Sequence, residues 1–198
     1  MATLDRAHIS AELAAIRSEM NTEKKGKRLE ALIALIFKAV AGLDLDDQDI
    51  ENNYETEEID LFFWNHREKE GLHFLDCPLI VECKGWSKPV PGRELRYFAT
   101  LLKDKGRSSG VFIALEGITG KAKDLTAGFF HIASAMAAGQ TVLIITGVDL
   151  EIIGSGEELV ALLRRRLLDQ VKSQVAAIEG TTVKKQQGAK KQAVKDSK

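Results

Sequence analysis

One short stretch says most about the fold of this chain: Leu-Ile-Val-Glu-Cys-Lys at residues 79–84. Its first half is apolar at consecutive positions, which is typical of a strand that is buried on both faces of a sheet. Side chains alternate between the two faces of a strand, so Glu82 and Lys84 project to one face and Cys83 to the other. The sequence therefore predicts a central strand within 73–84 whose end carries a carboxylate beside an ammonium group.

A second strand is predicted just before it. Residues 59–64, Ile-Asp-Leu-Phe-Phe-Trp, are rich in strand formers, and the polar residues 65–71 separate them from 73–84. This pattern predicts a hairpin in which Asp60 lies beside Glu82, with Lys84 within reach. Two neighbouring carboxylates repel each other unless a divalent cation lies between them. Oxygen ligands suit Mg²⁺ or Mn²⁺, and such a site beside a lysine can activate water to hydrolyse a phosphodiester.

Helical and strand patterns alternate around this hairpin. Apolar spacing predicts helices at 22–40, 92–105, 121–138 and 155–178, and short apolar runs predict strands at 110–115 and 141–146. Residues 44–60 contain nine carboxylates and no basic residue, and we interpret them as an acidic connector. This order of elements predicts an α/β domain with a mixed β-sheet.

Composition narrows the class of protein. With 198 residues, 44% of them apolar, the chain is long enough to fold around one core without a metal or disulfide staple. Cys77 and Cys83 fit neither a zinc site nor a redox pair. The N-terminus has no apolar core of signal-peptide length, and the uncharged residues 125–148 read as a buried helix and strand. We therefore expect a cytoplasmic protein with no membrane partner.

The motifs together resemble the PD-(D/E)XK nuclease superfamily. Asp60 is followed, after 21 intervening residues, by Glu82-Cys83-Lys84, and the helix before them carries Glu30 in the run Lys-Gly-Lys-Arg-Leu-Glu. Residues 58–61 and 81–86 are most similar to the Mrr-like, type IV restriction endonuclease branch. The chain has Ile59 where the superfamily name has proline, and Glu82 where some Mrr-like relatives carry glutamine. The resemblance covers roughly residues 25–146 and implies a restriction-endonuclease-like, three-layer α/β/α core with a central mixed β-sheet.

The resemblance also implies roles for individual residues. Asp60 and Glu82 would bind the catalytic Mg²⁺ or Mn²⁺, and the main-chain carbonyl of Cys83 would add a ligand. Lys84 would position or activate the attacking water, and Glu30 would assist through a metal-bound water. The products would be a 5′-phosphate and a 3′-hydroxyl, formed without a covalent intermediate.

On this basis we expect a metal-dependent DNA endonuclease that acts in restriction, defence or DNA processing. Residues 1–22 would form a helical extension, 23–179 the nuclease domain and 180–198 a disordered basic tail with six Lys and one Asp. Cutting both strands suggests a homodimer. No base-reading module is recognisable, so sequence specificity is weak or comes from a partner subunit. The basic residues of 92–105 and the tail are candidate contacts to DNA phosphates.

Other interpretations stay open from the sequence. A non-catalytic module of the same fold could bind nucleic acid or a protein, and the same site could cleave junctions or RNA. Asp60 and Glu82 could be solvated residues on an exposed sheet face, and Glu30 a charge on a helix surface. Residues 164–166, three arginines, are expected to face water beside the apolar stripe of the last helix.

Overall fold

The structure, a computed structural model, describes residues 2–51, 58–122 and 126–173. Its centre is a five-stranded sheet whose strands lie in chain order: β1 (Leu43–Glu51), β2 (Glu58–Asn65), β3 (Leu79–Lys84), β4 (Ser109–Ala114) and β5 (Thr141–Thr146). β1, β2 and β3 pair antiparallel, whereas β3, β4 and β5 pair parallel. The predicted mixed sheet is confirmed.

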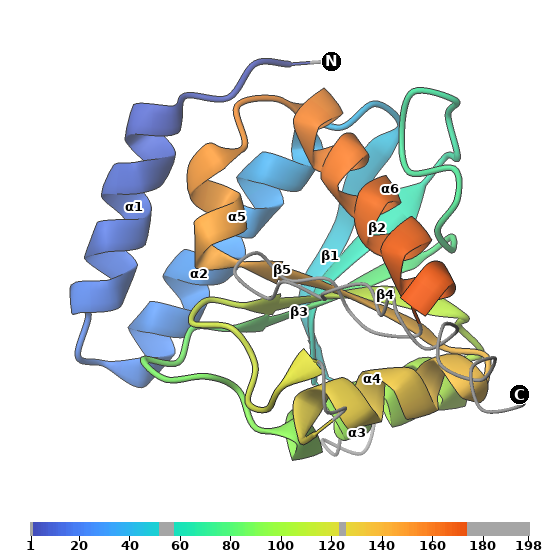
Figure 1. The fold of residues 1–198 in the computed structure, drawn as a ribbon. Coiled ribbons are helices and arrows are strands. Elements are labelled where there is room, and N and C mark those ends of the chain that lie inside the picture. Colours follow the sequence, from blue (N-terminus) through green and yellow to red (C-terminus); the bar gives the residue numbers. More distant parts are fainter. Residues whose placement is uncertain (1, 52–57, 123–125, 174–198) are drawn as a thin grey trace, which may run out of the picture.

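Helices cover both faces of this sheet (Figure 1). On one face lie α3 (Gly92–Asp104) and α4 (Gly128–Ala137). On the other lie α1 (Arg6–Ser18), α2 (Thr22–Lys38), α5 (Gly147–Ile152) and α6 (Gly156–Ser173). Each layer encloses its own cluster of buried apolar side chains, so the predicted three-layer α/β/α architecture is confirmed.

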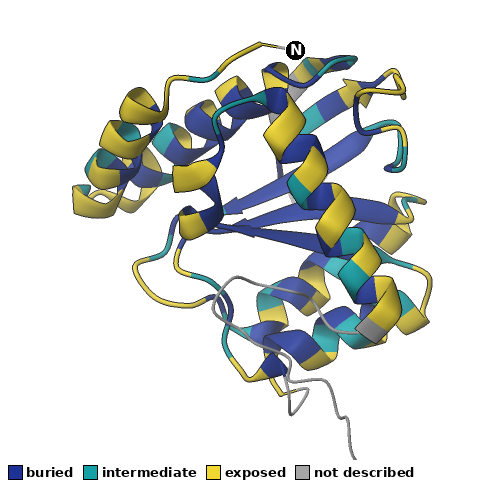
Figure 2. Ribbon diagram, turned by 45° about the horizontal axis from the view of Figure 1, so that its top comes forward, coloured by how far each residue is buried: buried dark blue, intermediate teal, exposed yellow. Residues whose placement is uncertain are grey.

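The strands in the middle of the sheet are buried on both sides, as Figure 2 shows. In β3, Ile80 packs into the cluster under α3 and α4, whereas Val81 and Cys83 pack into the cluster under α2. Because side chains alternate along the strand, Glu82 lies on the same face as Ile80, and Cys83 lies on the opposite face, as predicted. The face of the sheet under α3 therefore carries the chemical groups of the motif.

The prediction of an acidic connector at 44–60 is wrong for its first half, because residues 43–51 form the edge strand β1. Leu43 is buried and Leu45 half-buried, whereas Asp44 and Asp46 are exposed. This alternation is enough to form a strand that has leucines on the core side and carboxylates on the solvent side. The charges also discourage this edge strand from pairing with other chains. Residues 52–57 of the predicted connector lie outside the described part.

The hairpin of β2 and β3 is present, but its connection is longer than predicted. β3 begins at Leu79, not near 73, and turns occupy the residues before it. The buried Asn65 side chain explains this, because its Nδ2 donates to the carbonyl oxygens of Leu72, at 2.9 Å, and Leu75, at 3.3 Å. These bonds and the burial of both leucines hold the segment as a folded loop.

One predicted helix is shorter than expected, and one further helix is present that was not predicted. α4 begins at Gly128, not 121, and the Lys121 N–H donates to Thr126 Oγ1 at 2.9 Å. Residues 123–125 of the predicted helix lie outside the described part of the chain. The short α5 was not predicted. Its signal was a capping box, in which Thr146 caps the Asp149 N–H and the Asp149 carboxylate accepts from the Thr146 N–H.

The prediction that all three arginines of 164–166 face water is wrong for Arg166. Its side chain is buried, and its Nη2 donates to Oδ1 of the fully buried Asp149 at 2.5 Å. Arg164 and Arg165 are exposed, and Arg164 lies over the ring of Phe74 at 5.8 Å. Arg166 therefore fixes α6 to α5 and is not available to a ligand.

The first helix packs on the core. α1 buries Ile9, Leu13 and Ile16 in the same apolar cluster as α2. The predicted tail at 180–198 lies outside the described residues.

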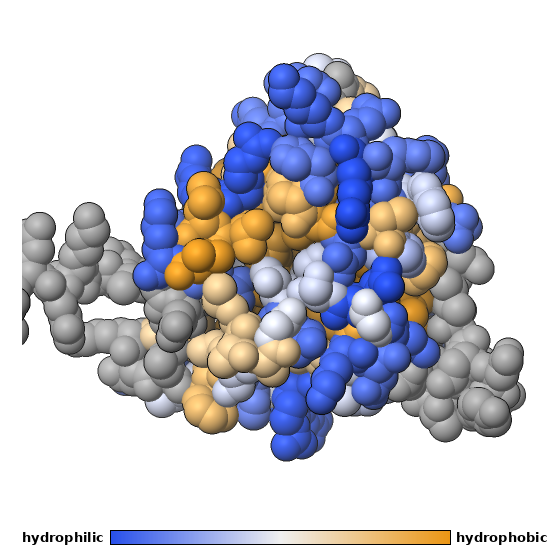
Figure 3. Space-filling view, turned by 90° about the vertical axis from the view of Figure 1, so that its right-hand side faces the viewer, coloured by the Kyte–Doolittle hydropathy of each residue, from blue (hydrophilic) through white to orange (hydrophobic). Residues whose placement is uncertain are grey.

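Among the residues that the structure describes, no helix is long and apolar enough to cross a membrane. Figure 3 shows the side of the molecule that lies to the right in Figure 1, where hydrophobic and hydrophilic areas lie next to each other.

Gly156, the first residue of α6, touches the end of α2 and offers a test of this packing. A Cβ added there would lie 2.1 Å from the carbonyl oxygen of Ala39, a backbone atom that cannot move alone. We expect Gly156→Ala to lower the free energy of unfolding in urea by about 1–3 kcal/mol. Gly26→Ala is the control, since a Cβ there would be 3.5 Å from Glu30 Oε1, an ordinary contact. Equal losses in both variants would contradict this packing.

Candidate active site

The site lies where β2 and β3 part. Their pairing ends at Leu61 opposite Val81. The Lys84 carbonyl accepts from the Leu115 N–H at 3.1 Å, so the backbone N–H and C=O of Lys84 point toward the neighbouring strand β4. Its neighbour Cys83 must turn its N–H and C=O the other way, toward β2. There the Cys83 N–H donates to Asp60 Oδ2 at 2.6 Å, so a carboxylate takes the place of the next ladder bond.

Asp60 and Glu82 are both buried, with 8% and 7% of their surfaces exposed. The Glu82 carboxylate forms an ion pair with the Lys84 ammonium group. Burying charge is costly unless the charge is paired or bonded, so these contacts are what allow two carboxylates to remain in the sheet. The interpretation of Asp60 and Glu82 as solvated surface residues is wrong.

Lys84 is the more accessible member of the pair, with 24% of its side chain exposed. Burial alone would lower the pKa of its ammonium group, but the charge and hydrogen bond of Glu82, with the charges of Asp60 and Glu94, raise that pKa overall. The side chain is therefore protonated at neutral pH. It acts as a hydrogen-bond donor and a positive charge at the mouth of the site.

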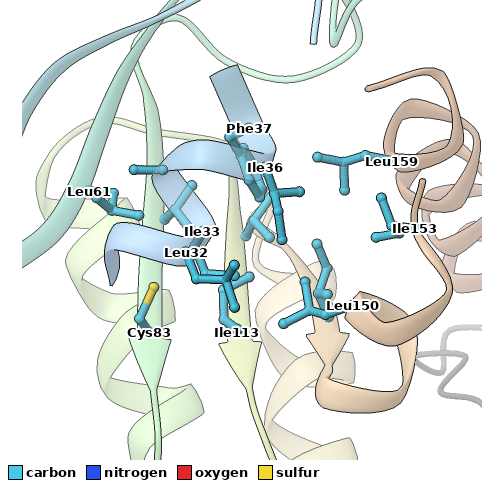
Figure 4. Close-up of a cluster of buried hydrophobic side chains, with 14 of the residues drawn as sticks. Leu32, Ile33, Ile36, Phe37, Leu61, Cys83, Ile113, Leu150, Ile153 and Leu159 are labelled. Carbon is cyan, nitrogen blue, oxygen red and sulfur yellow. The ribbon is translucent and has the colours of Figure 1, made fainter. Parts of the chain in front are cut away.

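Cys83 contributes its backbone to the site but not its sulfur. Figure 4 shows its side chain in the apolar cluster with Leu32 and Ile113. Alternation along β3 places the neighbouring Glu82 side chain on the other face of the sheet. Burial raises the pKa of the thiol well above its usual range, and the nearby carboxylates of Asp60, Glu82 and Glu30 raise it further. The thiol stays protonated, so only the carbonyl oxygen of Cys83 can serve as a ligand.

Glu30 reaches this region from α2. Only 7% of its surface is exposed, and its Oε2 lies 3.7 Å from Lys27 Nζ. α2 lies against the residue that follows β3, since a Cβ built on Gly85 would be 3.5 Å from side-chain carbons of Lys25 and Leu29. The Glu30 charge also raises the pKa of the Cys83 thiol. The interpretation of Glu30 as a helix-surface charge is therefore wrong. Asp60, Glu82 and Lys84 therefore meet at the ends of β2 and β3, and Glu30 is buried on α2, the helix that lies against the loop after β3.

Two further charged residues belong to this region. The sequence left open whether Lys25 contacts DNA or only flanks the helix, and gave Glu94 no role. Lys25 is buried on α2, and its Nζ donates to Ser87 Oγ at 2.8 Å, which ties the loop after β3 to the helix. Glu94, in the first turn of α3, acts electrostatically on Lys84. A lysine or a glutamate near a helix start resembles an ordinary solvated residue, so neither carried a distinctive signal.

The oxygen atoms gathered here fit a hard divalent cation. Asp60 and Glu82 supply two buried carboxylates. Strand geometry turns the Cys83 carbonyl toward β2, the side on which its N–H meets Asp60. In the described part of the chain, no group of three or more His, Cys, Asp or Glu side chains could hold a metal ion. A site with two carboxylates that completes its shell with water and substrate oxygens is what Mg²⁺ prefers.

Comparison with known proteins gives one match. The family model Mrr_cat, described as restriction endonuclease, matches residues 22–152. The match runs from the start of α2 to the end of α5 and includes every residue of the site described above. No curated protein and no solved structure matches the chain.

Proposed function

The chain belongs to the Mrr_cat family of restriction endonucleases, and from this premise we propose that it is a divalent-metal-dependent DNA endonuclease. The observation that supports the proposal best is the arrangement at the end of β3. There the Asp60 carboxylate is held by the Cys83 N–H, beside the buried ion pair of Glu82 and Lys84. We assign the catalytic roles to Asp60, Glu82, Lys84 and Glu30.

The metal would be held by the carboxylates of Asp60 and Glu82 and by the carbonyl oxygen of Cys83. When bound, Mg²⁺ or Mn²⁺ would polarise a phosphoryl oxygen and make water a better nucleophile at neutral pH. The hydrogen bond from the Cys83 N–H sets the orientation of the Asp60 carboxylate in advance. Such preorganisation matters because the carboxylate then needs no rearrangement during the reaction.

Lys84 would act on the attacking water and the phosphate. Because its ammonium group is protonated, it donates hydrogen bonds and does not remove a proton in the state described. It would orient the water for attack on phosphorus and stabilise the charge that develops on the phosphoryl oxygens. The P–O3′ bond would break, leaving a 5′-phosphate and a 3′-hydroxyl. Glu30 would assist through water from the side of α2.

Lys84→Ala tests this role. We expect cleavage to fall by about 10²-fold or more, since one positioned donor that stabilises the developing charge is worth that much. Binding of Mn²⁺ should persist, because Asp60 and Glu82 remain. The measurement pairs the single-turnover cleavage rate with calorimetric titration of Mn²⁺. Wild-type cleavage by Lys84→Ala would remove this lysine from the mechanism.

Calorimetric titration of the protein with Mn²⁺ also tests the proposed function itself. We expect one site in the wild type that weakens strongly in both Asp60→Asn and Glu82→Gln. A non-catalytic binding module has no need of a metal site that depends on these two carboxylates. An Mn²⁺ affinity that is unchanged in both variants would favour such a binding module over an enzyme.

We also propose that two copies act together on duplex DNA, because one hydrolytic site cuts one strand. The site described here is contained in a single chain. Light scattering of the protein with and without a DNA duplex gives the mass directly. A monomer in both conditions would remove this part of the proposal.

A further inference from the structure

α3 presents a basic surface beside the candidate active site. Its inner side is apolar and buried through Leu95, Phe98, Leu101 and Leu102. Its exposed side carries five residues at helical spacing, which we call the α3 outer face: Arg93, Arg96, Tyr97, Thr100 and Lys103. Three of these five side chains are cationic, although residues 1–179 carry an excess of acidic residues.

The α3 outer face is hollowed. Arg93, Glu94, Arg96, Tyr97 and Thr100 line one open surface pocket, and the Tyr97 side chain is half exposed beside the arginines. Thr100 Oγ1 donates to the carbonyl of Arg96 at 3.0 Å, so its hydroxyl proton is used within the helix. The cationic donors on this face are the guanidinium groups of Arg93 and Arg96, with the Lys103 ammonium group farther along.

Glu94 connects this face to the active site. It lies at the rim of the pocket, where the Arg93 Nε donates to its Oε1 at 2.9 Å. The same carboxylate is among the charges that act on Lys84 at the end of β3. α3 begins at Gly92, eight residues after Lys84 at the end of β3, so the helix follows the assigned catalytic groups closely along the chain. A strand of substrate at Lys84 would continue along the outer face.

The dimensions suit a nucleic-acid backbone. Arg93 and Lys103 are ten residues apart, which is about 15 Å along a helix. Phosphates of one DNA strand follow one another at about 3.4 Å along the duplex axis, so this length faces about four nucleotides. Arginine is well suited to phosphate because its planar group donates two parallel hydrogen bonds. The exposed Asp104 lies only at the far end of the helix.

We propose that the α3 outer face binds the phosphate backbone of the substrate and guides one strand into the active site. The inference rests on the proposed function and names the surface that the substrate occupies. Binding through phosphates is independent of sequence, so this face sets affinity and position but not recognition of a particular base sequence.

The test compares two triple variants that remove equal charge. Arg93→Ala, Arg96→Ala and Lys103→Ala together remove the cations of the α3 outer face. Lys38→Ala, Arg165→Ala and Lys172→Ala together remove three exposed cations from α2 and α6, in the layer on the opposite side of the sheet. Thermal unfolding of both checks that exposed substitutions leave the fold intact.

Two readouts are needed. The first is the affinity for a fluorescent DNA duplex at several salt concentrations with chelator present, so that no cleavage occurs. The second is the KM and kcat for plasmid cleavage in Mg²⁺. For the α3 variant we expect at least tenfold weaker binding, and a salt dependence whose slope is smaller by about 2 to 3, since each lost phosphate contact removes about 0.9. KM should rise while kcat at saturating DNA is unchanged.

The control variant should keep the wild-type salt slope and KM. If the α3 variant also keeps both, or if the two variants lose affinity equally, the inference is overturned while the proposed nuclease stands. If the wild type neither binds nor cleaves DNA, the proposed function has failed and the inference fails with it. The two failures are therefore distinguishable.

Discussion

Asp60→Asn and Glu82→Gln are each expected to abolish DNA cleavage, with a loss of at least about 10³-fold in the single-turnover rate. Each change replaces a carboxylate by an amide of the same shape. In Asp60→Asn the amide oxygen can still accept the bond from the Cys83 N–H, so the loss would come from the charge and not from the fold. A bound metal stabilises the transition state by several kcal/mol, and each loss of about 1.4 kcal/mol slows the reaction tenfold, which gives an effect of this size.

Matched controls separate catalysis from charge in general. Asp46→Asn and Glu157→Gln change the same groups at exposed positions on β1 and at the start of α6. These variants should cleave like the wild type, and circular dichroism should show all four variants folded. Cleavage by Asp60→Asn or Glu82→Gln within tenfold of the wild type would refute the assignment of the site.

The second large effect concerns stability. Asp149→Ala removes the partner of Arg166, whose side chain has 6% exposure, and also the acceptor for the Thr146 N–H and hydroxyl. A buried charge left without its partner costs about 3–5 kcal/mol. We expect a loss of that order in the free energy of unfolding, measured by urea denaturation, with α5 and the contact of α6 affected first.

A double variant distinguishes this cause from a simple loss of packing. In Asp149→Ala with Arg166→Met, no charge is left buried, and methionine fills much of the space of the arginine stem. The double variant should therefore be more stable than Asp149→Ala alone. If adding Arg166→Met lowers stability further, the cost does not come from the unpaired guanidinium group.

The part of the fold nearest the site was the most predictable. Three consecutive apolar residues at 79–81, after a polar turn, are typical of a strand buried on both faces, and alternation then places Glu82 and Lys84 together. The position of Asp60 followed from the hairpin. Helix periodicity predicted α2 and α3 within two residues of their ends, because each has a continuous apolar stripe.

The features that were missed depend on contacts between distant residues. Asp149 and Arg166 are 17 positions apart, and nothing local shows that an arginine on α6 turns inward to a capping carboxylate. β1 was hidden because its carboxylates outnumber its apolar residues, although Leu43 and Leu45 alternate correctly. The loop before β3 is folded by Asn65, a residue that the sequence places in a turn. In each case tertiary structure decided what local composition left open.

The most direct test of the central claim is incubation of purified protein with supercoiled plasmid, modified and unmodified, in Mg²⁺, in Mn²⁺ and with chelator, beside Asp60→Asn. The carboxylate site at the end of β3 predicts nicked or linear products only with metal, and none from the variant. Products that form equally with chelator, or equally from Asp60→Asn, would contradict it.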